Sequence, residues 1–444
     1  MASRDWTIGS RIKNRWQIHD IKRGGMGVVY IVYDHEWKEA FAAKTFQDEV
    51  FERNPETADR FIKEARAWVN LDLHENITQA RFVEDIDGKP CLFLEYVSGG
   101  DLSPWIGPRL TGEQPEVIGL AIQFCDGMTH ALSKGIKAHR DIKPGNCLVT
   151  EGGTIKITDF GLAKVLNDAE PSSHNDNHGV DHLSIMLSET GAAAGTPPFM
   201  APEQFVDSKY VDVRADIYSF GIMLFLMLAG DLPFRAKNAS DYAKPHRFQP
   251  PPHLRSTDKQ LCTIIEKCIA KEASKRYDDF MALRRELSEV FERLTGRTVP
   301  KPKVGRELDA FSLVNKGVSL KRLSGLSEAV VCYDNAVSLN PQMPEAWLNK
   351  GSVLNAMGHH RGAVACYDRC LQIAPSLQQA WYNKGIALSA IAENHEFAPK
   401  VKVWVVFPPS QMPLAGVPPT GATATIFEPP TARKTPWLVL LLTR

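Results

Sequence analysis

Apolar residues near the start of the chain form short runs that predict strands and then a helix. The stretch KRGGMGVVY at 22–30 leads into VVYIVYD, whose β-branched and aromatic residues are typical of a strand. FAAKTF at 41–46 is a further apolar run of strand length. In RFIKEARAWVNL, at 60–71, apolar residues recur at helical spacing. The pattern therefore predicts a hairpin around a glycine turn, another strand and an amphipathic helix.

One apolar stretch, IYSFGIMLFLMLAG at 217–230, invites comparison with a membrane span. It is shorter than the ~20 residues that a bilayer requires, and Asp216 stands directly before it. A buried core helix is therefore the prediction. The apolar run in the terminal PWLVLLLTR is shorter still, so we expect no membrane span.

Length, charge and cysteine content narrow the class of protein. The 444 residues allow about three domains at ~150 residues each. The 52 basic and 52 acidic residues cancel, so no net charge favours nucleic acid or an anionic membrane as partner. The eight cysteines contain no C-x-x-C pair, and the N-terminus MASRDWTIGSR lacks the apolar core of a secretory signal. We therefore expect a reduced, cytoplasmic protein.

Two short motifs carry the candidate chemistry. HRDIKPGN lies at 139–146, and DFG begins at Asp159. Asp141 is placed to accept the proton of an attacking hydroxyl, and Lys143 can balance charge on a transferring γ-phosphoryl group. Asn146 and Asp159 offer the hard oxygen ligands that suit Mg²⁺. The two motifs in this order and spacing are highly specific.

Together these motifs resemble those of eukaryotic-type serine/threonine protein kinases, over about 280 residues. GTPPFMAPE at 195–203 resembles the substrate-facing loop of that family and its anchor. The resemblance implies an α+β fold of two lobes, with ATP and Mg²⁺ between them and protein substrates phosphorylated on Ser or Thr. Lys143 and Thr196 follow the serine/threonine pattern, which tyrosine kinases lack. Small-molecule kinases, the alternative enzyme class, generally lack a GTPPFMAPE segment.

The resemblance also assigns roles outside the catalytic loop. The residues that it places at ATP are Gly24, Gly27, Val29, Ala42, Lys44, Glu64, Glu95 and Val97. Those that it gives a supporting role are Arg140, Thr196, Glu203, Asp216 and Arg276. An ion pair between Lys44 and Glu64 would hold the lysine against the α- and β-phosphates of ATP.

The glycine loop departs from the G-x-G-x-x-G-x-V pattern of the family. Lys22 occupies the place of the first glycine, whereas Gly24 and Gly27 are retained. These two are the positions where a missing side chain lets backbone N–H groups approach phosphate oxygens. We therefore interpret the loop as modified but working. The alternative from another class is a nucleotide-binding scaffold without catalysis, and the intact Asp141, Asn146 and Asp159 favour the enzyme.

The 39 residues between DFG and APE, 162–200, form a longer segment than the family needs. Its polar middle predicts a mobile surface insertion. Thr190, with Ser188 as the nearest competitor, is the candidate autophosphorylation site, because a phosphate there could pair with Arg140. His174, His178 and His182 recur every four residues, which leaves metal binding open, but the loop-forming residues around them favour a solvated loop.

A 34-residue period begins after the linker at 295–308. WLNKG at Trp347 returns as WYNKG at Trp381, and Tyr333 returns as Tyr367. This period resembles the tetratricopeptide repeat, a helix-turn-helix unit that generally binds protein segments. Two repeats are complete and a third is partial, so a structural appendage remains the alternative to a recruitment module.

The pattern and the family resemblances together predict five parts. They are an N-terminal extension at 1–11, a kinase domain at 12–294, the linker at 295–308, an all-α repeat segment at 309–393 and a proline-rich, disordered tail at 394–444. Phe397 and Val401 stand where the period calls for alanine and tyrosine. This loss of period is compatible with a native tail and with a changed reading frame.

Overall fold

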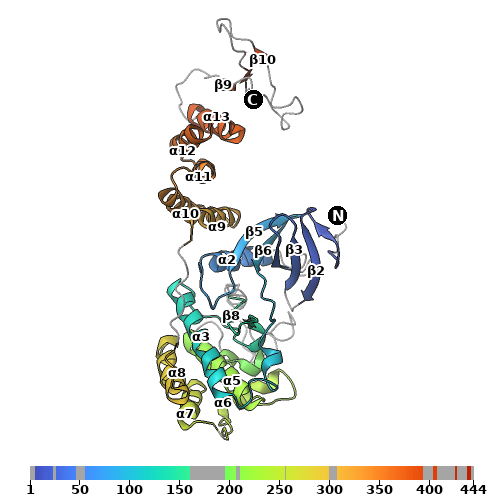
Figure 1. Ribbon diagram of the computed structural model, residues 1–444, viewed down its shortest axis with the longest axis vertical. Helices are drawn as coiled ribbons and strands as arrows, with labels where there is room; N and C mark the ends of the chain where they lie inside the picture. The colour runs from blue at the N-terminus through green and yellow to red at the C-terminus, as the bar shows by residue number, and fades with distance from the viewer. Residues whose placement is uncertain are drawn as a thin grey trace, which may run out of the picture. The chain divides into compact units, whose positions relative to one another are not determined.

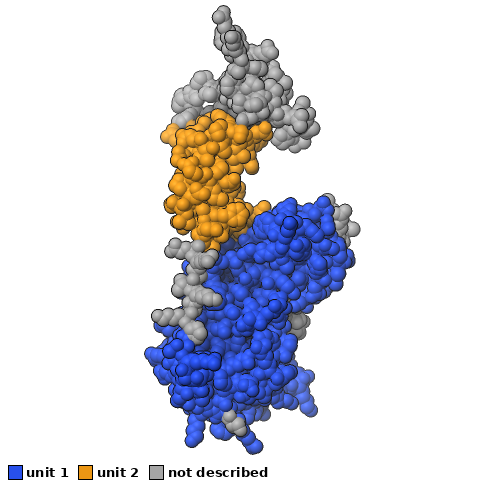
Figure 2. Space-filling model, viewed as in Figure 1, with its two compact units in different colours: residues 1–307 blue, residues 308–444 orange. Residues whose placement is uncertain are grey.

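The computed structural model divides the chain into two compact units, residues 1–307 and 308–444, coloured separately in Figure 2. It describes residues 6–23, 27–46, 56–160, 196–206, 211–255, 257–299, 308–393, 404–407, 426–427 and 438–441. The finer division into five parts stays a prediction.

Unit 1 begins with a six-stranded antiparallel sheet of order β1-β2-β3-β4-β6-β5 (Figure 1). Its strands are β1 (Arg11–Ile12), β2 (Trp16–Arg23), β3 (Gly27–Asp34), β4 (Glu39–Phe46), β5 (Ala80–Ile86) and β6 (Lys89–Glu95). Alternate residues of β3 are buried, as expected of a strand with one face on a core. That core is aromatic: Trp16, Phe41 and Phe93 are buried together. The predicted hairpin around the glycine turn is confirmed by the pairing of β2 with β3.

The start of the chain also packs on this sheet. The ring of Trp6 meets that of Tyr30 edge-on, with centroids 5.1 Å apart. The backbone N–H of Gly9 donates to Ile18 O at 2.8 Å. Trp6, which the sequence assigned to an extension, therefore packs against the core of the sheet.

The helix predicted at 60–71 is α2 (Glu56–Val69). It contacts strands β4, β5 and β6 of the sheet. Trp68 and Ala65 on its inner face are buried. Its amphipathic pattern therefore places Glu64 on a helix that lies against the strand of Lys44.

The rest of unit 1 is mainly helical, with a small β7–β8 hairpin (Figure 1). Its longer elements are α3 (Gln114–Ser133), β7 (Cys147–Val149), β8 (Ile155–Ile157), α5 (Val213–Ala229), α6 (Ala243–Phe248), α7 (Lys259–Cys268) and α8 (Phe280–Thr295). Helix α5 is buried around nearly its whole circumference, which confirms the prediction of a core helix. Among the described helices, none has the length and apolar character needed to cross a bilayer. The two-lobed α+β architecture expected from the sequence is therefore present.

In the part of unit 2 that the structure describes, five helices follow one another: α9 (Ala310–Arg322), α10 (Leu326–Leu339), α11 (Pro344–Ala356), α12 (His360–Ile373) and α13 (Gln378–Glu393). Each packs against its neighbours in sequence. Equivalent contacts recur 34 residues apart: the Trp347 indole donates to Pro341 O at 3.0 Å, and the Trp381 indole donates to Pro375 O at 2.9 Å. The 34-residue sequence period thus corresponds to the same side-chain contact repeated in successive helix pairs.

Glycine and tyrosine fix the closest approach between paired helices of unit 2. A Cβ atom at Gly317 would lie 2.6 Å from the Tyr333 ring, and one at Gly351 would lie 2.6 Å from the Tyr367 ring. Both tyrosines are fully buried. The glycines are therefore required because a ring occupies the space of their missing side chains.

Three short strands follow, β9 (Trp404–Phe407), β10 (Ile426–Phe427) and β11 (Leu438–Leu441), in the order β10-β11-β9. This differs from the tail without regular structure that the proline content predicted. Aromatic, β-branched and leucine residues in these runs favour strand pairing locally. The remainder of the tail lies outside the described residues.

Candidate active site

Lys44 projects from β4 and is buried, with 9% of its side chain exposed. Its ammonium Nζ lies 2.6 Å from Asp159 Oδ1. The chain therefore supplies the partner anion that a buried lysine requires. Glu64 lies on α2, half-buried and with its own interactions. The Lys44–Glu64 ion pair stays a prediction.

Asp159 adopts a left-handed backbone conformation, with φ of 64°. Burial raises the pKa of its carboxyl, but the charge and hydrogen bond of Lys44 oppose this, and the net result is a lowered pKa. The next residue, Phe160, is fully buried between the rings of His139 and Trp68, at centroid distances of 5.0 and 6.1 Å. This anchor, which the sequence did not indicate, holds an ionised carboxylate at the site.

Asp141 is the centre of a compact hydrogen-bond network. Lys143 Nζ donates to Asp141 Oδ2 at 2.6 Å and to Thr196 Oγ1 at 2.8 Å. Thr196 Oγ1 in turn donates to Asp141 Oδ1 at 2.9 Å. Asn146 Nδ2 donates to the same carboxylate, at 2.9 Å from Oδ2, and to Asp141 O at 2.8 Å. Both carboxylate oxygens are therefore oriented, and the amide oxygen of Asn146 is left as an acceptor for a cation.

Asp216, at the start of α5, fixes the backbone of the loop at 139–146, which is the candidate catalytic loop. It accepts from the backbone N–H groups of His139 at 2.6 Å and Arg140 at 2.7 Å. Burial raises the pKa of Asp216 to about 6, although His139 and the two backbone donors act in the opposite direction. Nε2 of His139 lies 2.9 Å from Thr158 O, which connects this loop to the residue before Asp159. The loop is thus fixed at its backbone.

Arg140 has an unusual environment within this loop. Its backbone is left-handed, with φ of 69°. Its Nε is buried and has no hydrogen-bond partner among the described residues. A buried guanidinium nitrogen without a partner is costly, and an anion would satisfy it.

Glu203 and Arg276 form a bidentate ion pair, with N–O distances of 2.7 and 2.9 Å. The Arg276 side chain is fully buried, and it also donates to the carbonyl oxygens of Arg214, Ala270 and Lys271. The guanidinium fork matches the carboxylate, so this pair ties the loop containing Thr196 to the helical part of unit 1.

The glycine-loop residues that the structure describes lie on adjacent strands. Gly27 begins β3, and Lys22 pairs across the β2–β3 ladder with Val29 and is exposed. Val29 itself pairs with Lys44 on β4, and Ala42 lies on the same strand as Lys44. A Cβ at Gly27 would lie 3.2 Å from Thr45 O, so even alanine is tight there. Lys22 therefore lies at a solvated strand end.

Glu95 and Val97 lie at and just beyond the end of β6. The Glu95 carboxylate pairs with Lys156 Nζ at 2.6 Å, and its backbone N–H donates to Gln79 O at 2.9 Å. Val97 is buried. The connection between the two lobes is therefore held by an ion pair from β8.

Several sequence-predicted residues lie outside the described residues. They are Gly24, Ser188, Thr190, His174, His178 and His182. No group of three or more His, Cys, Asp or Glu side chains suited to a metal ion occurs in the part of the chain that the structure describes.

The comparisons with known proteins agree with this geometry. Residues 17–287 match the family model of the protein kinase domain, and residues 344–377 match a tetratricopeptide repeat. The chain is 32% identical over 295 residues to serine/threonine-protein kinase Pkn1 of Myxococcus xanthus, covering 65% of this chain and 40% of the relative. It is 32% identical over 304 residues to serine/threonine-protein kinase PknA of Corynebacterium glutamicum, covering 67% and 59%.

The chain thus spans about half the length of the curated relatives that it matches. The kinase match alone includes more than half of the 444 residues, and it contains the Asp141 network, the Lys44–Asp159 pair and the Glu203–Arg276 pair. On these grounds, the chain belongs to the protein kinase family.

Proposed function

We propose that this protein is a serine/threonine protein kinase that transfers the γ-phosphoryl group of ATP to hydroxyls of protein substrates. The observation that carries the proposal is the Asp141 network, in which Thr196 and Lys143 orient the two carboxylate oxygens. Both relatives described above are named as serine/threonine kinases. The same two residues, Lys143 and Thr196, follow the serine/threonine pattern in the sequence.

In the proposed reaction, the acceptor hydroxyl oxygen forms a bond to the γ-phosphorus while its proton passes to Asp141. The bond between the γ-phosphorus and the β–γ bridging oxygen breaks, and ADP leaves. Lys143 offsets the negative charge that spreads over the transferring group. Lys44 would contact the α- and β-phosphates once ATP competes for it with Asp159.

Asn146 and Asp159 fit a divalent cation. Both present oxygen ligands, and the lowered pKa of Asp159 keeps its carboxylate ionised. Mg²⁺ commonly uses one or two protein oxygens together with substrate phosphates, which suits a site with so few acidic groups. When bound, Mg²⁺ would offset charge on the phosphate oxygens.

We further propose that unit 2 recruits a protein partner, since tetratricopeptide repeats generally bind protein segments. We also propose autophosphorylation at Thr190 or Ser188, with the phosphate paired to Arg140, whose Nε is buried without a partner among the described residues. All eight cysteines are buried free thiols, which supports a reducing, cytoplasmic location.

The test compares purified full-length protein with Asp141→Asn and Asp159→Asn. Each variant should reduce phosphate incorporation from ATP into protein by at least ~100-fold, in line with the loss of a catalytic base or metal ligand. Asp87→Asn is the matched control: it makes the same chemical change in an exposed turn where φ is 55°, a conformation that asparagine tolerates. Wild-type protein that binds ATP but phosphorylates nothing would favour the scaffold instead.

A further inference from the structure

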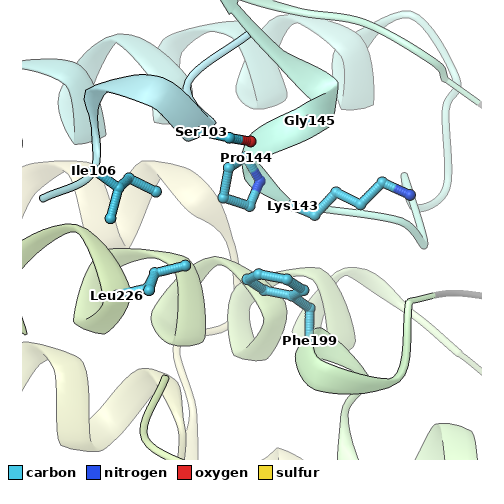
Figure 3. A pocket seen from close by; sticks show the side chains of 7 residues that line it. All are labelled: Ser103, Ile106, Lys143, Pro144, Gly145, Phe199 and Leu226. Atoms are coloured by element: carbon cyan, nitrogen blue, oxygen red, sulfur yellow. The ribbon is translucent and has the colours of Figure 1, made fainter. Parts of the chain in front are cut away.

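A pocket with a volume of about 490 Å³ lies beside the catalytic loop, in the helical part of unit 1. Four segments line it: η1 (Ser103–Trp105) with the residue that follows it, η2 (Pro144–Asn146), η4 (Pro197–Phe199) and α5. Figure 3 shows its lining side chains, which are Ser103, Ile106, Lys143, Pro144, Phe199 and Leu226, with Gly145 completing the wall. Segments distant in sequence thus converge on one apolar cavity.

The chemistry of the lining is apolar, with no carboxylate. Ile106, Pro144, Phe199 and Leu226 supply hydrocarbon surface. Leu226 is the one residue between Ala215 and Leu228 of α5 that is not fully buried, so it is the point at which this core helix reaches the pocket. Such a surface stabilises an apolar guest and offers no counter-charge to a lysine or arginine.

Asp101 precedes η1 in the chain but is not among the residues that line the pocket. Asp101 Oδ1 accepts from the backbone N–H of Ser103 at 2.8 Å, which fixes the turn. The charged group that does line the pocket is Lys143, a cation. Among the lining residues, a basic guest would therefore meet a cation and no carboxylate.

Lys143 connects this pocket to the reacting centre. Its aliphatic stem forms part of the wall, and in Figure 3 its ammonium end points away from Ile106 and Leu226. That ammonium lies 2.6 Å from Asp141 Oδ2 and 2.8 Å from Thr196 Oγ1. A chain that placed its acceptor hydroxyl at Asp141 would pass the pocket within about three residues, since an extended chain advances ~3.3 Å per residue.

We propose that this pocket receives one apolar side chain of the protein substrate, within about three residues of the acceptor Ser or Thr, and that it selects against Lys and Arg at that position. The inference rests on the proposed kinase function and specifies its substrate class. A pocket of this size, within the ~300–1,000 Å³ range of ligand sites, accommodates a side chain as large as Leu, Met or Phe.

The first test is a set of peptides with one Ser acceptor, in which each of the three positions on either side carries Leu, Phe, Ala or Arg in turn. Full-length wild-type protein should prefer Leu or Phe over Arg at one position by about 10-fold to 100-fold in kcat/KM, the range that burial of one such side chain supplies. Equal efficiency with all four residues at every position would overturn the proposal.

Two variants place a carboxylate in the pocket from different elements. Position 145 has space for the Gly145→Glu side chain, because a Cβ atom there would meet only Lys143 Cε, at 4.0 Å, and the backbone φ of Gly145 is not left-handed. Leu226→Glu introduces the carboxylate from α5 instead. Each should shift the preference toward Arg by at least ~10-fold. Gly152→Glu is the matched control: this glycine is also exposed, and its Cβ would meet only Thr150 Oγ1 at 3.8 Å. It should keep the wild-type preference.

Binding of matching peptides with Ala in place of the acceptor Ser separates this inference from the proposed function. If wild-type protein phosphorylates no peptide but binds the Leu peptide about 10-fold more tightly than the Arg peptide, the kinase proposal fails and the pocket assignment stands. If phosphorylation occurs and the preference for Leu survives in both glutamate variants, the pocket assignment fails alone. If another segment of this chain occupies the pocket, both glutamate variants should likewise keep the wild-type preference for Leu.

Discussion

Thr196 allows a sharp test of how the catalytic carboxylate is oriented. Thr196→Val keeps the shape of the side chain and removes the hydroxyl that donates to Asp141 Oδ1 and accepts from Lys143 Nζ. A hydrogen bond to a charged group contributes ~1.5–3 kcal/mol. Because the Asp141 and Lys143 side chains are 21% and 29% exposed, water can replace part of this hydrogen bonding in the valine variant.

We therefore expect a loss of about 1–2 kcal/mol of transition-state stabilisation, which is about 5-fold to 30-fold in kcat. Thr196→Ser, which retains the hydroxyl, should stay within about 3-fold of wild type, equivalent to less than ~1 kcal/mol. Steady-state kinetics with a peptide substrate, at saturating ATP and Mg²⁺, measure both variants, and the KM for ATP should not change. Valine and serine variants of equal activity would refute the role of this hydroxyl.

Three further predictions concern stability. Burial raises the pKa of Asp216 from 3.8 to about 6, so protonation of this carboxyl favours the folded state. As the pH rises from about 4 to 6, the free energy of unfolding of wild type should therefore fall by about 3 kcal/mol relative to that of Asp216→Asn. Thermal unfolding of both proteins across that pH range measures the difference. Arg276→Met leaves a partly buried carboxylate without its partner, so chemical denaturation should show a loss of about 3 kcal/mol. Gly351→Ala forces a methyl group against Tyr367 and should destabilise unit 2 by ~1–3 kcal/mol, whereas Gly362→Ala, whose Cβ meets a leucine methyl at an ordinary 3.5 Å, should not.

Much of the active site could be predicted from the sequence because its residues are fixed by local chemistry. Asp141 and Asn146 lie on one short loop, so their contact follows from backbone geometry. The buried lysine on an apolar strand required an anion, and the structure supplies one in Asp159. That Asp159 would lie within hydrogen-bond distance of Lys44 was not predictable, since this depends on how a loop is placed relative to a strand.

The apolar pocket could not be predicted for a different reason. Leu226 belongs to a helix that is apolar on all sides, and such a helix has no hydrophobic face from which an orientation can be inferred. Phe199 lies in η4, a 3₁₀ helix of three residues that is too short to show a periodicity. Only the packing of α5 against the loops that contain Pro144 and Phe199 shows that Leu226 reaches a cavity.

The recurring glycine–tyrosine contact of unit 2 has a consequence for how that unit can change in length. Gly317 with Tyr333 and Gly351 with Tyr367 make the same contact one period apart, so each 34-residue segment brings both halves of its own helix-pair junction. Because each helix packs on its sequence neighbours, the free energy of such an array is close to a sum of repeat and junction contributions. Insertion or deletion of a whole segment therefore preserves every type of junction, and a protein built in this way can lengthen or shorten its helical array by duplication without redesigning its core.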